Sequence, residues 1–270
     1  MAVFSEIQPW QTETPGERLF LLAYGLAKSV IPTSLAEIPW VVSGQGISEF
    51  LRLVVAMELT HRCLNAAVEV IEANPDASSD AVMRELRDSV QLYGSNRALG
   101  PITEQSRLAA LAYVNRKLTD GRKKATHRDE RQYCCWCGTH TSRRSGGLQT
   151  DRGTVEHLWP EFLGGTSIPE NLTIACKDCN SARQHAFTWA WFGLQACNEK
   201  IDSDRGLPRS IYLALALHRL IRVASGQTRL SRSLISLKDA SKILKGAMPQ
   251  VSLRSDRRYT FFEILQMSTE

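Results

Sequence analysis

Long hydrophobic runs are missing from this chain of 270 residues. Its longest apolar stretches are interrupted by Arg, Glu or Lys, so none reaches the about 18 apolar residues that a membrane-spanning helix needs. The first residues lack a basic segment followed by an apolar block, which is the pattern of a secretion signal. Internal repeats and low-complexity segments are missing as well, which argues against a repeat protein. We therefore expect a cytoplasmic protein with no membrane partner.

The composition is ordinary for a globular protein, with 43% hydrophobic and 23% charged residues. Thr14-Pro15-Gly16-Glu17 is a capping box with proline at the first helical position, and it predicts a helix that stops before Pro32. Apolar residues at helical spacing predict further helices over 48–72, 79–93 and 103–118. Near the other end we expect helices over 186–192, 208–225 and 231–246, then a short strand or helix over 259–267.

Basic charge is concentrated in the later part of the chain. Residues 1–114 hold 8 Lys or Arg against 13 Asp or Glu, whereas residues 115–186 hold 12 against 8 and residues 187–270 hold 13 against 7. A basic half indicates contact with a polyanion such as a nucleic acid, although solvated helix faces rich in Arg give the same balance. Residues 120–131 are charged without any apolar period, so we expect a connector there, which either contacts phosphates or is only solvated.

Five of the seven cysteines form two tight clusters. Cys134 and Cys137 make one C-x-x-C pair, and Cys176 and Cys179 make a second. In a reducing compartment such pairs favour a metal over disulfides, and four thiolates suit tetrahedral Zn²⁺. All four positions would be taken by protein, so the zinc is expected to be structural and to contribute on the order of 10 kcal/mol to folding. Cys135 offers an alternative register for the first pair, or is a buried small apolar residue.

The residues between the two pairs carry more than a zinc site requires. Residues 154–157 are expected to form a strand, Gly164-Gly165 a turn and residues 172–174 the returning strand, with a helix beginning close to Asn180. This ββα arrangement would bring Glu156 and His157 opposite the start of that helix. Carboxylate and carboxamide oxygens are the ligands that a hard cation such as Mg²⁺ prefers, and a helix N-terminus favours an anion.

This stretch resembles the HNH endonucleases of the ββα-metal class, in the subgroup stapled by four cysteines. The resemblance covers residues 134–183 and rests on several independent positions at the family spacing. They are the two cysteine pairs, Glu156-His157, Pro160, Gly164-Gly165, Asn171-Leu172, Asn180 and Arg183. Two positions depart from the commoner pattern, because Asn180 replaces a third His and Arg183 replaces a Lys.

The resemblance implies a role for each of these side chains. His157 would act as the general base, and Asn171 would orient it. Glu156 and Asn180 would hold a catalytic Mg²⁺ or Mn²⁺ that stabilises charge on the phosphate. Arg183 would bind the substrate phosphate. His185 is a candidate third ligand or phosphate contact, and is otherwise an ordinary polar helix residue.

We therefore expect a mainly α protein with a small α+β module. Residues 1–120 would form a helical regulatory or partner-binding domain, residues 121–192 the nuclease module, and residues 193–270 helices packed on it. The expected activity is metal-dependent cleavage of DNA, as an effector in bacterial defence against phage and under a partner such as an ATPase. The alternatives are a catalytically weak nucleic-acid-binding module and a nuclease acting on RNA or tRNA under a partner's control.

Overall fold

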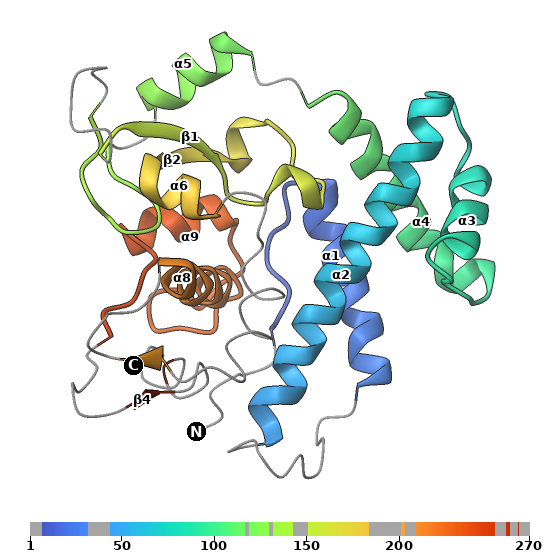
Figure 1. Ribbon diagram of the computed structural model, residues 1–270, viewed down its shortest axis with the longest axis horizontal. Helices are drawn as coiled ribbons and strands as arrows, with labels where there is room; N and C mark the ends of the chain where they lie inside the picture. The colour runs from blue at the N-terminus through green and yellow to red at the C-terminus, as the bar shows by residue number, and fades with distance from the viewer. Residues whose placement is uncertain are drawn as a thin grey trace.

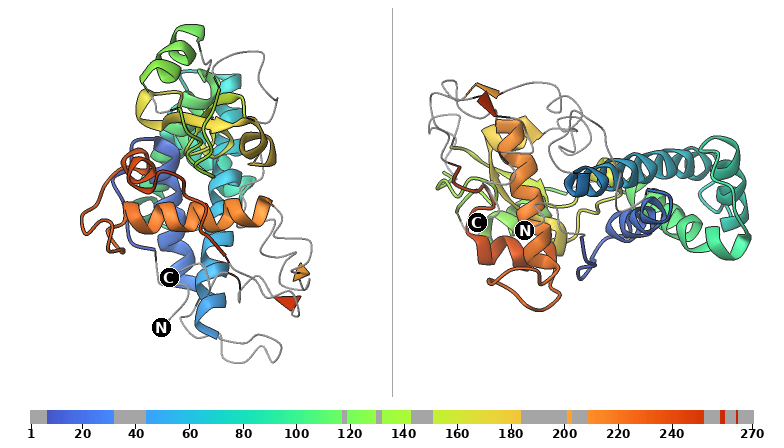
Figure 2. Two further views of the ribbon diagram at one scale, coloured as in Figure 1. Left: turned by 90° about the vertical axis from the view of Figure 1, so that its left-hand side faces the viewer. Right: turned by 90° about the horizontal axis from the view of Figure 1, so that it is seen from below.

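The computed structural model describes the greater part of the chain. The described residues are 7–31, 44–116, 119–129, 132–142, 151–183, 201–202, 209–251, 258–259 and 264. The expectation of a mainly helical chain with a small α+β module is confirmed. Four helices lie on one side of the molecule, and the small sheet lies on the other with the later helices (Figures 1 and 2).

The N-terminal helices pack on one another. They are α1 (Pro15–Val30), α2 (Gly44–Ala73), α3 (Ser79–Asp88) and α4 (Asn96–Val114). The predicted capping box is confirmed, because the Thr14 hydroxyl accepts from the Glu17 N–H and the Glu17 carboxylate accepts from the Thr14 N–H. Within the described residues, no helix is both long and apolar enough to cross a membrane.

Several helix boundaries differ from those predicted, and the structure gives the reason for two of them in the N-terminal half. Helix α4 begins at Asn96 rather than at residue 103, because the Ser95 hydroxyl caps it by accepting from the Ala98 N–H. The helix continues through Pro101, which removes only one main-chain donor. Helix α3 ends at Asp88 rather than at residue 93, and Gln91 soon afterwards adopts a left-handed φ of 58°, which cannot continue a helix.

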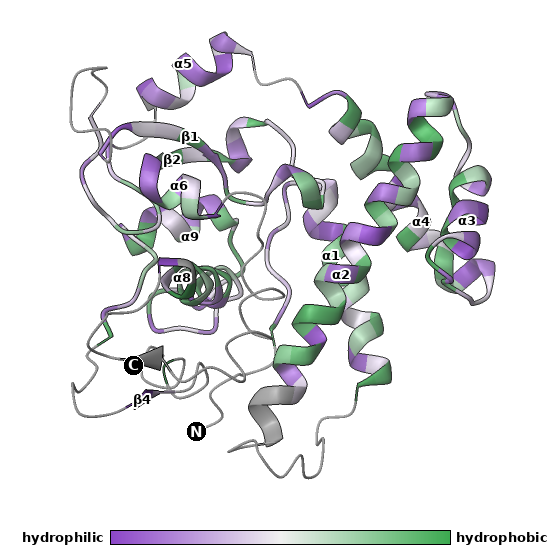
Figure 3. Cartoon of the chain, in the orientation of Figure 1, coloured by the Kyte–Doolittle hydropathy of each residue, from purple (hydrophilic) through white to green (hydrophobic). Residues whose placement is uncertain are grey.

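The connector expected over 120–131 contains a helix, α5 (Asp120–Asp129), that the sequence did not predict. It has no apolar stripe and is hydrophilic along its length (Figure 3). It nevertheless contacts both strands of the sheet, and the Arg122 guanidinium donates to the main-chain oxygen of Ser167 at 2.6 Å. Tertiary contacts of this kind leave no periodic signal in the sequence.

The predicted ββα arrangement is confirmed. Strand β1 (Gly153–His157) pairs antiparallel with β2 (Leu172–Cys176), and α6 (Lys177–Arg183) follows at once. Between the strands lie two short 3₁₀ helices, η1 (Glu161–Leu163) and η2 (Pro169–Asn171). The register places Glu156 opposite Thr173 and His157 opposite Leu172. Because side chains alternate along a strand, Glu156 and His157 belong to opposite faces of the hairpin.

The remaining elements cover the module from below in Figure 1. They are β3 (Ile201–Asp202), α8 (Arg209–Ala224), α9 (Leu237–Leu244) and β4 (Arg258–Tyr259). The helix predicted over 208–225 is confirmed as α8, whereas the one predicted over 231–246 is shorter, because Ser236 caps its start and Lys245 ends it with a left-handed φ of 51°. The helix predicted over 186–192 lies outside the described residues.

One hydrophobic core joins the N-terminal helices to the nuclease-like module. The rings of Trp10, Phe20 and Trp159 meet at its centre, with 5.1 Å between the centroids of Phe20 and Trp159. Beside these rings the N–H of Gly16 donates to the main-chain oxygen of Gly164 at 3.2 Å. The division at residue 120 stays a prediction, and the core does not stop there.

The contact between Gly16 and Gly164 gives a test of this docking. A Cβ added at Gly16 would lie 2.0 Å from the main-chain oxygen of Leu163, so Gly16→Ala should destabilise the fold by about 1–3 kcal/mol, the usual cost of overpacking. Gly25→Ala is the matched control in the same helix, because nothing lies within 4 Å of its added Cβ. It should be neutral or stabilising by about 0.5–1 kcal/mol. Urea unfolding measures both, and equal effects would contradict the docking.

Candidate functional site

Four cysteines converge as predicted. The sulfur atoms of Cys134, Cys137, Cys176 and Cys179 all lie within 4.8 Å of one another. The distance between Sγ of Cys137 and Sγ of Cys176 is 3.8 Å. A tetrahedral zinc ion with Zn–S bonds of about 2.3 Å separates its sulfur ligands by roughly 3.8 Å. The donor set and its spacing therefore fit a zinc ion.

Local backbone structure places these thiols. The main-chain oxygen of Cys134 accepts from the Gly138 N–H, and the Cys137 N–H points at the Cys134 sulfur at 3.5 Å. Gly138 closes this turn with a left-handed φ of 74°, a conformation that glycine adopts without strain. We call residues 133–138 the zinc turn. The other two thiols come from the end of β2 and the first turn of α6.

Cys135 lies outside the cluster, which settles the choice of register within the described residues. Its N–H donates to the Ile174 oxygen, and its own oxygen accepts from the Ala247 N–H. Burial raises the pKa of the Cys135 thiol well above its ordinary value, which keeps it protonated. Cys135 therefore joins β2 to the segment after α9 through its main chain.

An arginine from α8 completes the surroundings of the cluster. Nη1 of Arg209 lies 3.5 Å from the Cys179 sulfur and 3.9 Å from the Cys176 sulfur. Four thiolates around Zn²⁺ carry a net negative charge, which a nearby guanidinium offsets. Sequence interpretation missed this residue, because it lies far along the chain from the cysteines and carries no local motif.

His157 ends β1 and is held by a hydroxyl. Its Nε2 lies 3.0 Å from Oγ of Ser167, and that hydroxyl donates to the main-chain oxygen of Arg116 at 3.1 Å. Burial, and then the charge of Arg183, lowers the pKa of His157 to about 4, so the ring is neutral near pH 7. Ser167 was missed from the sequence, where a lone serine in a loop carries no signal.

The Ser167 contacts also indicate the tautomer of His157. Ser167 has one hydroxyl proton, and the Arg116 oxygen can only accept it. The carboxylate of Glu161, another acceptor, lies 3.5 Å from the same His157 nitrogen. Both facts favour a proton on Nε2 that is donated to Ser167. The lone pair available to take a proton is then on Nδ1.

Among the described residues the side chain of Asn171 makes no hydrogen bond to His157, contrary to its expected orienting role. Its Oδ1 accepts from the Trp159 N–H at 2.7 Å, and its Nδ2 donates to the main-chain oxygens of Trp159 and Thr166. This buried carboxamide therefore fixes the loop that follows His157, because it satisfies the main-chain groups that the loop cannot pair for itself. Its influence on His157 is exerted through the backbone.

Arg183 is not placed to bind a substrate phosphate, which corrects the role expected from its resemblance to a family lysine. Its guanidinium pairs with Glu156 inside the protein and donates to the main-chain oxygens of His157 and Leu158. It also lies 4.6 Å from the centre of the Trp136 ring. Only 5% of Arg183 is exposed, so its role is to tie α6 to the end of β1.

Glu156 and Asn180 each retain an oxygen that could bind a cation. Burial raises the pKa of Glu156, and the charge of Arg183 opposes that rise. Oε2 of Glu156 is buried and makes no hydrogen bond with the described residues. Nδ2 of Asn180 donates to Oγ1 of Thr154 and to the Val155 oxygen, so the carboxamide oxygen stays available. These oxygens fit a hard divalent cation in kind. His185 lies outside the described residues.

The zinc assignment predicts that a cysteine of the cluster and the cysteine outside it respond differently to substitution. Cys176→Ser should lose the zinc and unfold the module at lower temperature, because a closed four-thiolate site supplies folding free energy. Cys135→Ala, the control, should keep a full zinc content. Elemental analysis and thermal melting of the two purified variants make the comparison. Normal zinc content in the Cys176 variant would contradict the assignment.

The Ser167 contact predicts the tautomer of a single histidine. Ring ¹⁵N chemical shifts of His157, measured near pH 7 where the ring is neutral, should show the proton on Nε2. Ser167→Ala should shift the population toward the other tautomer, and Ser167→Thr should restore it. A proton on Nδ1 in the unmodified protein would contradict the proposed hydrogen-bond direction.

Comparison with known proteins agrees with this geometry. The family model described as HNH endonuclease matches residues 134–186. Comparisons with the curated proteins and with the solved structures found no match. The matched segment contains both cysteine pairs, the hairpin and α6. Residues 134–186 are therefore similar to an HNH endonuclease module.

Proposed function

We propose that this protein is a metal-dependent endonuclease that hydrolyses phosphodiester bonds in DNA. The observation that carries the proposal is the position of His157, whose Nε2 is bound to Ser167 at the end of β1 within the matched module. A fixed, neutral imidazole with one nitrogen available is what a general base needs. The zinc cluster, by contrast, has four protein ligands and leaves no position for water, so its role is to stabilise the fold of the module.

In the proposed reaction, Nδ1 of His157 accepts a proton from the water that attacks phosphorus in line with the leaving oxygen. Ser167 holds the ring in place during this transfer. The oxygens of Glu156 and Asn180 would hold Mg²⁺ or Mn²⁺, which would stabilise the charge that develops on the phosphate oxygens. The charge of Arg183 opposes the rise that burial causes in the pKa of Glu156, and Asn171 fixes the loop beside the base.

Helix α5 supports a nucleic-acid substrate. Lys123 and Lys124 are exposed on it, and its Arg122 is bonded to Ser167, the same residue that holds His157. Exposed lysines near the proposed base can contact the phosphates that flank the cleaved bond, a contact that weakens as salt concentration rises. DNA is the proposed substrate, and RNA is the alternative that the assay below includes.

The N-terminal helices support a partner-binding role. Residues 1–114 carry more acidic than basic residues, a balance that disfavours direct contact with DNA. Large apolar side chains are also exposed there, with 72% of Val30 and 77% of Tyr93 accessible. We propose that a regulatory protein, such as an ATPase, binds this half. A role as an effector in defence against phage is part of the same proposal and rests on the family resemblance.

Loss of the base should slow cleavage strongly without loss of the fold. We expect His157→Ala to nick plasmid DNA about 10²–10⁴-fold more slowly than the unmodified protein in Mg²⁺ or Mn²⁺, the usual contribution of general base catalysis. Zinc content and melting temperature are measured on both proteins, and RNA is tested in parallel.

Equal cleavage by both proteins would remove His157 from the reaction. Tight DNA binding without cleavage by either would favour the alternative of a nucleic-acid-binding module. Cleavage of RNA alone would replace DNA as the substrate.

A further inference from the structure

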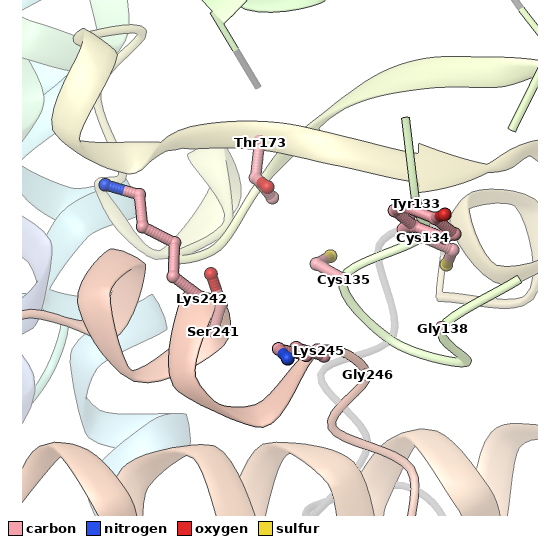
Figure 4. Close-up of a pocket in the computed structure, with 9 residues that line it drawn as sticks. All are labelled: Tyr133, Cys134, Cys135, Gly138, Thr173, Ser241, Lys242, Lys245 and Gly246. Carbon is pink, nitrogen blue, oxygen red and sulfur yellow. The ribbon is translucent and has the colours of Figure 1, made fainter. Parts of the chain in front are cut away.

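A cavity of about 340 Å³ lies beside the zinc turn. Three segments line it: the zinc turn, Thr173 of β2, and the end of α9 with the residues that follow (Figure 4). Figure 4 shows Lys242 and Lys245 on the α9 side and Tyr133 on the zinc-turn side. Sequence interpretation predicted a helix here but assigned it no function, and the proposed reaction uses none of these side chains.

The cavity is separate from the proposed catalytic site. Thr173 lines it from the Glu156 face of the hairpin, but Glu156 itself is not a lining residue. Neither His157 nor Asn180 is among the lining residues. A phosphate bound in this cavity would therefore be held by other residues than those proposed to act on the cleaved phosphate.

The backbone around the cavity is fixed on two sides. After α9 the N–H groups of Ala247 and Met248 donate to the main-chain oxygens of Cys135 and Trp136. Gly138 and Gly246 approach so closely that a Cβ at either would lie 2.9 Å from main-chain atoms of the other segment. The main chain on both sides of the cavity is thus held in place without a ligand, as is common in sites for small molecules.

Two lysines at the cavity favour an anion, although Cys134, which belongs to the negatively charged four-thiolate cluster, also lines it. Lys245 makes no ion pair with the described residues, and Lys242 has only an exposed contact at 3.4 Å to Asp239, which is too weak to hold it. Both ammonium groups are therefore available to a phosphate. Lys238, one turn earlier in α9, donates instead to the Pro169 oxygen and does not line the cavity.

The opposite side of the cavity favours a planar group. Tyr133 is 52% exposed, and its ring is already packed edge-on against His140 at 5.3 Å. A partly exposed tyrosine offers a face on which a nucleobase can stack. A volume of about 340 Å³ is at the lower end for ligand sites, which suits one nucleotide rather than two.

We propose that this cavity binds a single nucleotide, with its phosphate at Lys242 and Lys245 and its base on Tyr133. The nucleotide comes either from the pool of free mononucleotides or from one unpaired position of a nucleic-acid strand. The proposal does not depend on cleavage by the module, because binding alone defines it.

Calorimetric titration of the zinc-loaded full chain with AMP tests the proposal. Lys242→Ala/Lys245→Ala should weaken AMP binding about tenfold or more, because charge-assisted hydrogen bonds are lost. Arg84→Ala/Arg97→Ala, which removes two exposed cations in the N-terminal helices, should leave it unchanged. Tyr133→Leu should weaken AMP about fivefold or more while leaving inorganic phosphate unaffected.

A short single-stranded DNA distinguishes the two sources of the nucleotide. Displacement of AMP by this DNA, with weaker DNA binding in the double lysine variant, identifies a strand position; no displacement identifies a free nucleotide. The proposal is overturned if AMP does not bind at millimolar concentration, or binds the double lysine variant as tightly as the unmodified protein. His157→Ala should bind AMP normally, so loss of cleavage and loss of this site can be told apart.

Discussion

The four-thiolate cluster is the constraint on which the remaining geometry depends. It joins Cys137 to Cys176, which are 39 residues apart, and thereby fixes the zinc turn against the junction of β2 and α6. The start of α6 in turn places Arg183 beside Glu156 and beside the end of β1. Helix α8 contributes Arg209 to the same cluster. A cluster that suits a structural metal therefore helps to set where the proposed catalytic side chains stand.

The dipeptide Glu156-His157 carries out two tasks because a strand separates adjacent side chains. Glu156 lies on the face covered by α6. A buried carboxylate is unstable without a cation beside it, and Arg183 is that cation. His157 lies on the other face, where a neutral ring is stable and Ser167 supplies a hydrogen bond. One residue of shift in the register with β2 would exchange these surroundings and leave a carboxylate without its partner. The pairing of the hairpin is thus a chemical as well as a structural requirement.

The sequence allowed the local features to be predicted, and it failed for contacts made at a distance. Capping at Thr14, the two strands and the cysteine cluster follow from short-range patterns and were confirmed. Helix α5 was missed because its stability comes from contacts such as Arg122 with Ser167, not from an apolar stripe. The burial of Arg183 was missed for a related reason, because a basic residue at a family position gives no sign of which way its side chain turns.

The close approach of Gly16 and Gly164 bears on how the two halves of the chain can evolve. Gly164 belongs to the glycine pair by which the module resembles its family, and an added Cβ there would lie 2.8 Å from Cβ of Ala109 in α4. A module taken from another protein would need the same turn at this position, because the turn packs against Gly16 and Ala109. The N-terminal helices could therefore not be replaced by an unrelated helical domain without loss of these contacts. Changes in either half must be accepted by the other, and the two are expected to vary together as one inherited unit.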